Sequence, residues 1–170
     1  FEYSKIFKGG FKTNFKKILA DTTTPVSIYL RLRDIFPNSL LLESSDYHSR
    51  DNNISYICCQ SIAGILLNDE KLTINYPGQE IQEKAASSIN LKEEVSAFRK
   101  AFNPTELSDI NVISNGLFGY FTFDAITHFE DISLSTPPDP ERNIPSMQYH
   151  TYTSDITTDH FRNQLSPFDI

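Results

Sequence analysis

The sequence of 170 residues contains no tryptophan and only two cysteines, Cys58 and Cys59, which are adjacent. Neighbouring residues on a strand point to opposite faces, so this pair is poorly placed to form a disulfide or to bind one metal ion. The four histidines are scattered and form no pair at the spacing of metal ligands. We therefore expect free thiols, a cytoplasmic protein and no metal site supplied by this chain.

Long hydrophobic runs and an excess of basic residues are also absent. No apolar run reaches the roughly 18 residues that a membrane-spanning helix needs. The 15 Lys and Arg residues are outnumbered by 22 Asp and Glu residues, which gives a net charge of −7. Nucleic acids and anionic membranes bind basic surfaces, so we expect neither as a partner.

Motifs of catalysis are missing as well. The sequence has no Walker loop and no nucleophile-elbow serine, and Gly116 and Gly119 lack the third glycine of a dinucleotide-binding turn. These two glycines instead indicate a close approach of backbones within a sheet. Glu93 and Glu94 lie near lysines and are expected on a solvated face. A chain with 13 Phe and 8 Tyr but no reacting groups is more often a binding or regulatory lobe than a whole enzyme.

Two helices are predicted from their first residues. Thr24 before Pro25 is a typical helix start, because the hydroxyl caps a free N–H and the proline has none to lose. This helix is expected to extend to about Ile35, with a buried face formed by Val26, Tyr29, Leu30, Leu32 and Phe36. Asn90 and Glu93 resemble a capping box. The helix that follows, 91–102, is expected to bury Leu91, Val95, Phe98 and Phe102.

Strands are predicted where β-branched and aromatic residues gather or alternate. The clearest is 54–67, with a possible bulge at Gly64, and 71–76 is its expected hairpin partner. Further strands are expected at 39–45, 116–123 and 148–158, and at 11–19, which also fits a short helix. A polar loop at 46–53, a helical turn at 124–129 and a proline-rich connector at 136–145 complete the chain. Helices and strands come in runs without regular alternation, which favours an α+β fold with a mainly antiparallel sheet in one domain, 1–170.

Several of these segments resemble the amino-terminal domain of the anthranilate synthase component I family. The first stretch contains LADTTTPVSIYLRLR at 19–33, LLLESSD at 40–46 and ISYICC at 54–59. The second is GLFGYFTFDA at 116–125. The LLES segment alone is a weak signal, but the segments occur in the family's order, and together they cover roughly 11–149.

The resemblance implies that the LLES segment contributes to a feedback site for L-tryptophan. Ser44 would offer a hydroxyl, and Glu43 would attract the ammonium group. Leu42 or Ile54 would form an apolar wall for the indole. Without the resemblance, 40–45 would be interpreted only as a core strand with a polar end.

The resemblance also implies the fold of that family's amino-terminal lobe and a regulatory role in a lyase. That enzyme converts chorismate and glutamine-derived ammonia to anthranilate and pyruvate, the first committed step of tryptophan biosynthesis. In the family, chorismate, Mg²⁺ and the acid–base residues belong to a carboxy-terminal domain whose motifs are absent from 1–170. The chain is therefore expected to be a non-catalytic fragment without a cofactor of its own.

The partners implied are L-tryptophan, the chorismate-binding domain and a glutamine amidotransferase subunit, component II. Two alternatives stay open. One is the amino-terminal domain of aminodeoxychorismate synthase component I, and the other is a stand-alone amino-acid-binding or interaction module.

Residues 151–159 depart from the family pattern. They read TYTSDITTD, which is unusually polar for a central strand, and we expect them to form an exposed sheet edge. Ser166 and Pro167 are expected to interrupt the strand that follows. Asn115 replaces the first glycine of the second family segment.

Overall fold

A computed structural model of the chain describes residues 14–44, 53–68, 71–102, 116–135 and 144–169. The predictions for 11–13, for the polar loop at 46–52, for Asn115 and for the connector at 136–143 lie outside the described residues.

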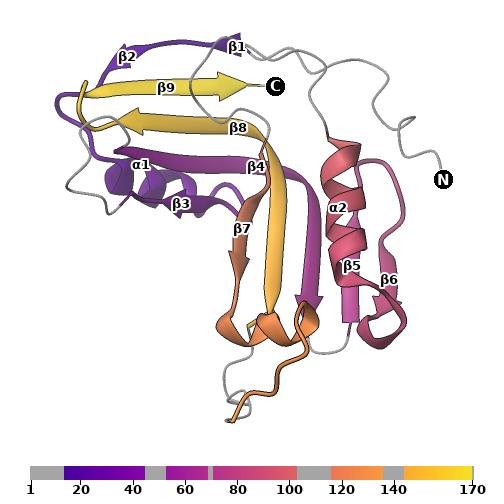
Figure 1. The fold of residues 1–170 in the computed structure, drawn as a ribbon. Helices are drawn as coiled ribbons and strands as arrows, with labels where there is room; N and C mark the ends of the chain where they lie inside the picture. The colour runs from indigo at the N-terminus through magenta and orange to yellow at the C-terminus, as the bar shows by residue number, and fades with distance from the viewer. Residues whose placement is uncertain (1–13, 45–52, 69–70, 103–115, 136–143, 170) are drawn as a thin grey trace. The chain divides into compact units, whose positions relative to one another are not determined.

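The described strands form one nine-stranded sheet (Figure 1), in which every pair with a defined register is antiparallel. They are β1 (Asn14–Phe15), β2 (Ile18–Leu19), β3 (Leu40–Leu42), β4 (Ile54–Asn68), β5 (Lys71–Asn75), β6 (Gln82–Ala85), β7 (Phe118–Phe121), β8 (Met147–Asp159) and β9 (Gln164–Asp169). The helices are α1 (Pro25–Leu32) and α2 (Leu91–Ala101), with 3₁₀ turns η2 (Ala86–Ser88) and η3 (Phe123–His128). The strand order is β1-β9-β8-β4-β5-β6, with β2 on β9, β3 on β4 and β7 on β8. The predicted α+β fold is confirmed.

The described residues fall into two compact units. The first unit contains 62–68, 71–102, 117–135 and 144–151, and the second contains 14–44, 53–61, 116 and 152–169. Strands β4 and β8 each contribute residues to both units. The expectation of one domain over 1–170 stays a prediction.

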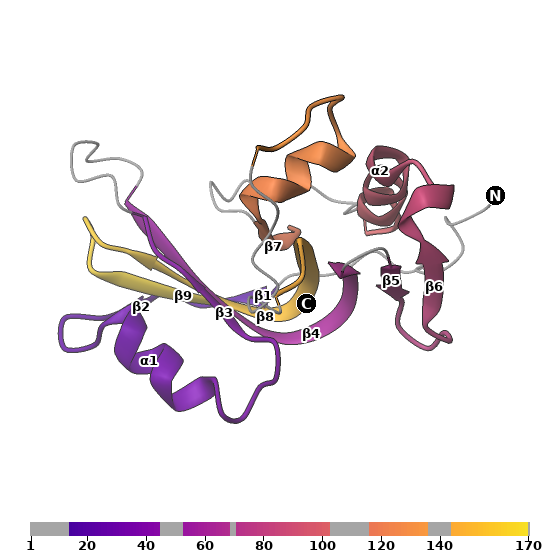
Figure 2. The same cartoon turned by 90° about the horizontal axis from the view of Figure 1, so that it is seen from below.

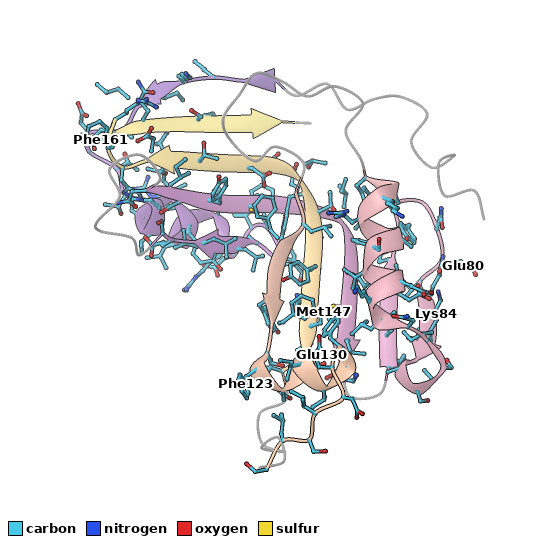
Figure 3. The ribbon with its side chains drawn as sticks, in the orientation of Figure 1. Glu80, Lys84, Phe123, Glu130, Met147 and Phe161 are labelled. Carbon is cyan, nitrogen blue, oxygen red and sulfur yellow. The ribbon has the colours of Figure 1, made fainter. Side chains whose placement is uncertain are left out.

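The core of the first unit lies between α2 and the β4–β5 hairpin. Figures 1 and 2 both show α2 alongside β5 and β6. The rings of Tyr76, Phe98 and Phe102 lie 5.1 to 6.1 Å apart, and Met147 (labelled in Figure 3) is fully buried in the same core. The Asn90 side chain accepts a hydrogen bond from the Glu93 N–H at 3.4 Å. The predicted cap at Asn90 is confirmed, but the Glu93 carboxylate accepts from the Asn90 side chain and not from its backbone N–H as in a capping box. The predicted burial is confirmed for Leu91, Phe98 and Phe102, and Val95 is half-buried.

Strand β4 confirms the predicted long strand but not its bulge at Gly64. Gly64 pairs with Asn75 in an unbroken register with β5. A Cβ atom at Gly64 would lie only 2.9 Å from Nδ1 of His150, so close packing explains this glycine. The alternation breaks instead at Gln60, whose φ is +58°.

The second unit carries α1 on one face of its strands (Figure 2). Thr24 accepts a hydrogen bond from the Ser27 N–H at 3.1 Å, which confirms the predicted helix start. The prediction that Val26 and Leu30 are buried is wrong, because both are exposed. At 100° per residue they lie opposite Ile28, one of the half-buried residues of the helix. The helix also ends at Leu32 rather than near Ile35.

The expectation that 151–159 form an exposed edge is wrong. Strand β8 lies between β9 and β4, and its buried polar residues are Thr151, Asp155, Thr157 and Thr158. Threonine is β-branched and packs well on a pleated surface, and the Thr157 hydroxyl donates to the Ser166 carbonyl oxygen at 3.3 Å.

Pro167 does not interrupt β9, contrary to the prediction. It pairs with Ile156 within an unbroken register. The Lys16 N–H donates to the Pro167 carbonyl oxygen, and the N and C=O of one strand residue point to the same side. The missing N–H of the proline therefore faces the gap between β1 and β2, and the ladder with β8 loses nothing.

Candidate functional site

The pairing of β3 with β4 decides which face each candidate residue occupies. Leu42 lies opposite Tyr56, so their side chains share one face of the sheet. Ile54 lies two residues before Tyr56 on β4, so its side chain is on that face as well. Strand β3 ends at Leu42, and Glu43 and Ser44 follow it directly. The structure therefore places Leu42 and Ile54 on one face of the sheet, with Glu43 and Ser44 in the segment that leaves β3 beside them.

The end of β3 is accessible to a ligand. Leu42 is 37% exposed, Glu43 is exposed, and Ser44 and Ile54 are half-buried. Among the described strands, β3 pairs only with β4, so its outer edge carries backbone groups without a strand partner. Such an edge can offer N–H and C=O groups to the charged ends of a free amino acid.

Two tyrosines form hydrogen bonds with the residues directly before β3. The Tyr152 hydroxyl donates to the Asn38 carbonyl oxygen at 2.6 Å, and the Tyr29 hydroxyl donates to the Ser39 carbonyl oxygen at 3.4 Å. These contacts connect β8 and α1 to the residues directly before β3. They fix the position from which the segment 42–44 extends.

Beside Tyr152 lies a buried acid–thiol pair. Asp155 is 4% exposed, and Cys58 is completely buried. Burial raises the pKa of Asp155 to about 7, and the hydrogen bond with Cys58 partly opposes this rise. Burial, followed by the charge of Asp155, raises the pKa of the Cys58 thiol far above its ordinary range, so the thiol donates to the carboxylate.

Sequence reasoning missed Asp155 and Tyr152 as residues that support the site. The signal that could have found Asp155 is a single acidic residue in the middle of a segment rich in threonine, since β-branched residues on both sides indicate a strand. Which side of the sheet it faces depends on its neighbours β9 and β4, and the local sequence does not contain that information.

A second pair joins the buried Ser55 to the half-buried His160. The Ser55 Oγ atom and the His160 Nε2 atom are 2.7 Å apart, and the backbone N–H of His160 donates to the Asn53 carbonyl oxygen at 3.1 Å. Ser55 is 0% exposed, so a substrate cannot reach its hydroxyl. The pair anchors the β8–β9 turn to β4 and does not form a nucleophilic site.

The described part of the chain offers little else for chemistry beyond these two pairs. Within it, no group of three or more His, Cys, Asp or Glu side chains is arranged to hold a metal ion. Both cysteines are free and buried. No helix among the residues described has the length and apolar character to cross a membrane.

Comparison with known proteins adds a relationship. No protein-family model matches the chain. The anthranilate synthase component 1 of Lactococcus lactis subsp. lactis (strain IL1403) is 30% identical over 155 residues, which are 88% of this chain and 30% of that protein. The protein of the same name from Pseudomonas aeruginosa is 32% identical over 124 residues, which are 72% of this chain and 24% of that protein. The crystal structure of anthranilate synthase component I from Streptococcus pneumoniae TIGR4 aligns with 89% of this chain, and the alignment includes 31% of the Streptococcus chain. The sequence identity is 22% and the TM-score is 0.46.

The chain is thus an α+β protein built on a mainly antiparallel sheet. It is related over most of its length to anthranilate synthase component I, which confirms the resemblance seen in the sequence. The chain spans about a quarter to a third of the length of the curated relatives it matches.

Proposed function

We propose that this chain is the amino-terminal regulatory portion of an anthranilate synthase component I and contributes to its feedback site for L-tryptophan. The relationship to proteins of that name supports the assignment, as does the small share of their length that the chain spans. In this proposal the complete protein is a lyase that forms anthranilate and pyruvate from chorismate and ammonia. The chain itself is non-catalytic, and chorismate and Mg²⁺ are bound by the remainder of that protein.

The observation that carries the site proposal is the shared face at the end of β3. Leu42 and Ile54 supply apolar surface beside the Ser44 hydroxyl, next to a strand edge that pairs with no described strand. An amino acid with a large apolar side chain needs this combination. In this proposal Ser44 shares the face of Leu42 and Ile54, and the exposed Glu43 acts through its charge on the ammonium group and not as part of the apolar wall.

The proposal includes the partners and the location of the complete protein. A glutamine amidotransferase subunit, component II, would supply ammonia, and the chorismate-binding domain of the same polypeptide would complete the tryptophan site. The free, buried thiols are compatible with a cytoplasmic location.

The test measures tryptophan inhibition of ammonia-dependent anthranilate formation in the full-length protein. We expect Ser44→Ala to raise the inhibition constant on the order of tenfold, since a hydrogen bond to a charged group contributes about 1.5 kcal/mol or more. Turnover without tryptophan should stay unchanged. The control is Ser133→Ala, which removes the hydroxyl of an exposed serine in the first unit.

Three results would count against the proposal. Inhibition that is equal in Ser44→Ala and in the control removes the role of Ser44. A wild-type enzyme that tryptophan does not inhibit removes the feedback site. Formation of aminodeoxychorismate in place of anthranilate would assign the chain to the related synthase.

A further inference from the structure

Asp155 is a buried acid, only 4% exposed. One of its oxygens, Oδ1, has no hydrogen-bond partner, and the hydrogen bond of the group is with the Cys58 thiol. None of the ion pairs formed within the described residues involves Asp155. A buried carboxylate in this situation is costly, and binding a proton removes most of that cost.

The titratable groups that face Asp155 are uncharged at neutral pH. Strand β4 contributes the thiols of Cys58 and Cys59, and β8 itself contributes the phenol of Tyr152. From α1, the phenol of Tyr29 lies near Tyr152. No basic group from these elements offsets a negative charge on Asp155, and the hydrogen bond from the Cys58 thiol only partly compensates for its burial.

This cluster also anchors β3. Cys58 lies opposite Leu40, the first residue of β3, and Tyr152 binds the Asn38 carbonyl oxygen. Ionisation of Asp155 therefore favours local opening of the packing around it, which lets water reach the carboxylate. Where this opening separates β8 from β4, it breaks the hydrogen bond from the Tyr152 hydroxyl to the Asn38 carbonyl oxygen and loosens the start of β3, while Leu40 stays paired with Cys58.

We propose that protonation of Asp155 controls how firmly the start of β3 is held, and thereby makes ligand binding by residues 42–44 dependent on pH. With the proton bound, β8 and β4 stay packed and β3 is fixed. Without the proton, the start of β3 opens more often, and a ligand must order this strand when it binds. The ligand part of this inference rests on the proposed tryptophan site, whereas the strand part does not.

The sign of the effect follows from proton linkage. Burial raises the pKa of Asp155 from its ordinary value of 3.8 to about 7, so the packed state binds the proton more tightly than the open state. The stabilisation of the packed state by this proton is therefore fully present below pH 3.8 and decreases as the pH rises. Above about pH 7 the carboxyl is ionised in both states, and this stabilisation is lost.

The experiment is hydrogen exchange of the peptide 38–44 in the ligand-free protein, expressed as protection factors. Between about pH 5.5 and about pH 8.5, we expect protection in the wild type to fall by roughly ten- to thirty-fold. In Asp155→Asn, which is neutral at every pH, protection should not change with pH. The control Asp34→Asn removes a carboxylate whose side chain is 82% exposed, and it should behave as the wild type.

Each outcome decides the proposal. Constant protection in the wild type overturns it, and so does an equal pH dependence in Asp155→Asn. If Asp155→Asn fails to fold, an NMR titration of the Asp155 carboxyl in the wild type replaces it, and a pKa below 5 overturns the inference. If β3 exchange depends on pH but tryptophan never inhibits the full-length protein, the proposed function fails and the anchor stands.

Discussion

Gly119 offers a direct test of how tightly β7 and β8 pack. A Cβ atom added to this glycine would lie 1.9 Å from the Gln148 carbonyl oxygen and 2.8 Å from its carbonyl carbon. Real Cβ atoms essentially never approach within 3.0 Å, so β7 must move away from β8 by at least about 1 Å. The neighbouring atoms belong to the backbone, so no change of side-chain rotamer can relieve the contact.

The expected cost of Gly119→Ala follows from the ladder that this movement disrupts. Phe118, Gly119, Tyr120 and Phe121 are all in register with β8. A shift of about 1 Å stretches N–H···O contacts beyond their useful range, and each lost hydrogen bond costs about 0.5–1.5 kcal/mol. We expect the free energy of unfolding to fall by about 2–4 kcal/mol, measured by urea denaturation with circular dichroism and tyrosine fluorescence.

Gly64 provides the matched comparison. Its added Cβ would meet the side chain of His150 at 2.9 Å, and a side chain can move. We expect Gly64→Ala to cost less than Gly119→Ala, and to cost little in a His150→Ala background, because the contacting ring is gone. A Gly119→Ala protein as stable as the wild type, or one that His150→Ala rescues, would refute the reasoning.

The remaining predictions concern burial. Phe98 is 0% exposed, so Phe98→Ala should lower the free energy of unfolding by about 3–5 kcal/mol. Phe123 is 83% exposed and points away from the strands (Figure 3). We therefore expect Phe123→Ala to lower the free energy of unfolding by less than about 0.5 kcal/mol. Equal losses of stability in the two variants would contradict the assignment of Phe98 to the core. Cys58 and Cys59 are buried, and burial raises both pKa values. A thiol reagent at pH 8 should therefore react with them on the order of 10³-fold more slowly than in guanidinium, and rapid labelling of the native protein would show that this layer opens readily.

Local signals were sufficient for the first residues of the helices. The cap at Asn90 and the spacing of Leu91, Phe98 and Phe102 depend only on residues within a few turns, and the structure confirms them. The buried face of α1 was not predictable in the same way. An eight-residue helix with apolar residues on all sides can turn several faces inward, and contact with β3 selects the one that contains Tyr29.

The interior position of β8 was hidden for a different reason. Its polarity is a local property, whereas burial depends on β9 and β4, which come from distant parts of the sequence. For the candidate site, the register with β4 was needed to place Ile54 on the face of Leu42, and the importance of Asp155 followed only from its burial.

The composition of β8 has a consequence for the unfolded chain. A strand in the interior of a sheet is usually an uninterrupted apolar segment, and such a segment is prone to form cross-β aggregates when exposed. In 151–159 the large apolar side chains are those of Tyr152 and Ile156, and Asp155 and Asp159 add negative charge. Before folding, this segment therefore associates poorly with its own copies. The native pairing with β4 and β9 gives it stable neighbours, so we expect the same low apolar content that disguises the strand in the sequence, together with its two carboxylates, to make the unfolded chain less prone to aggregation.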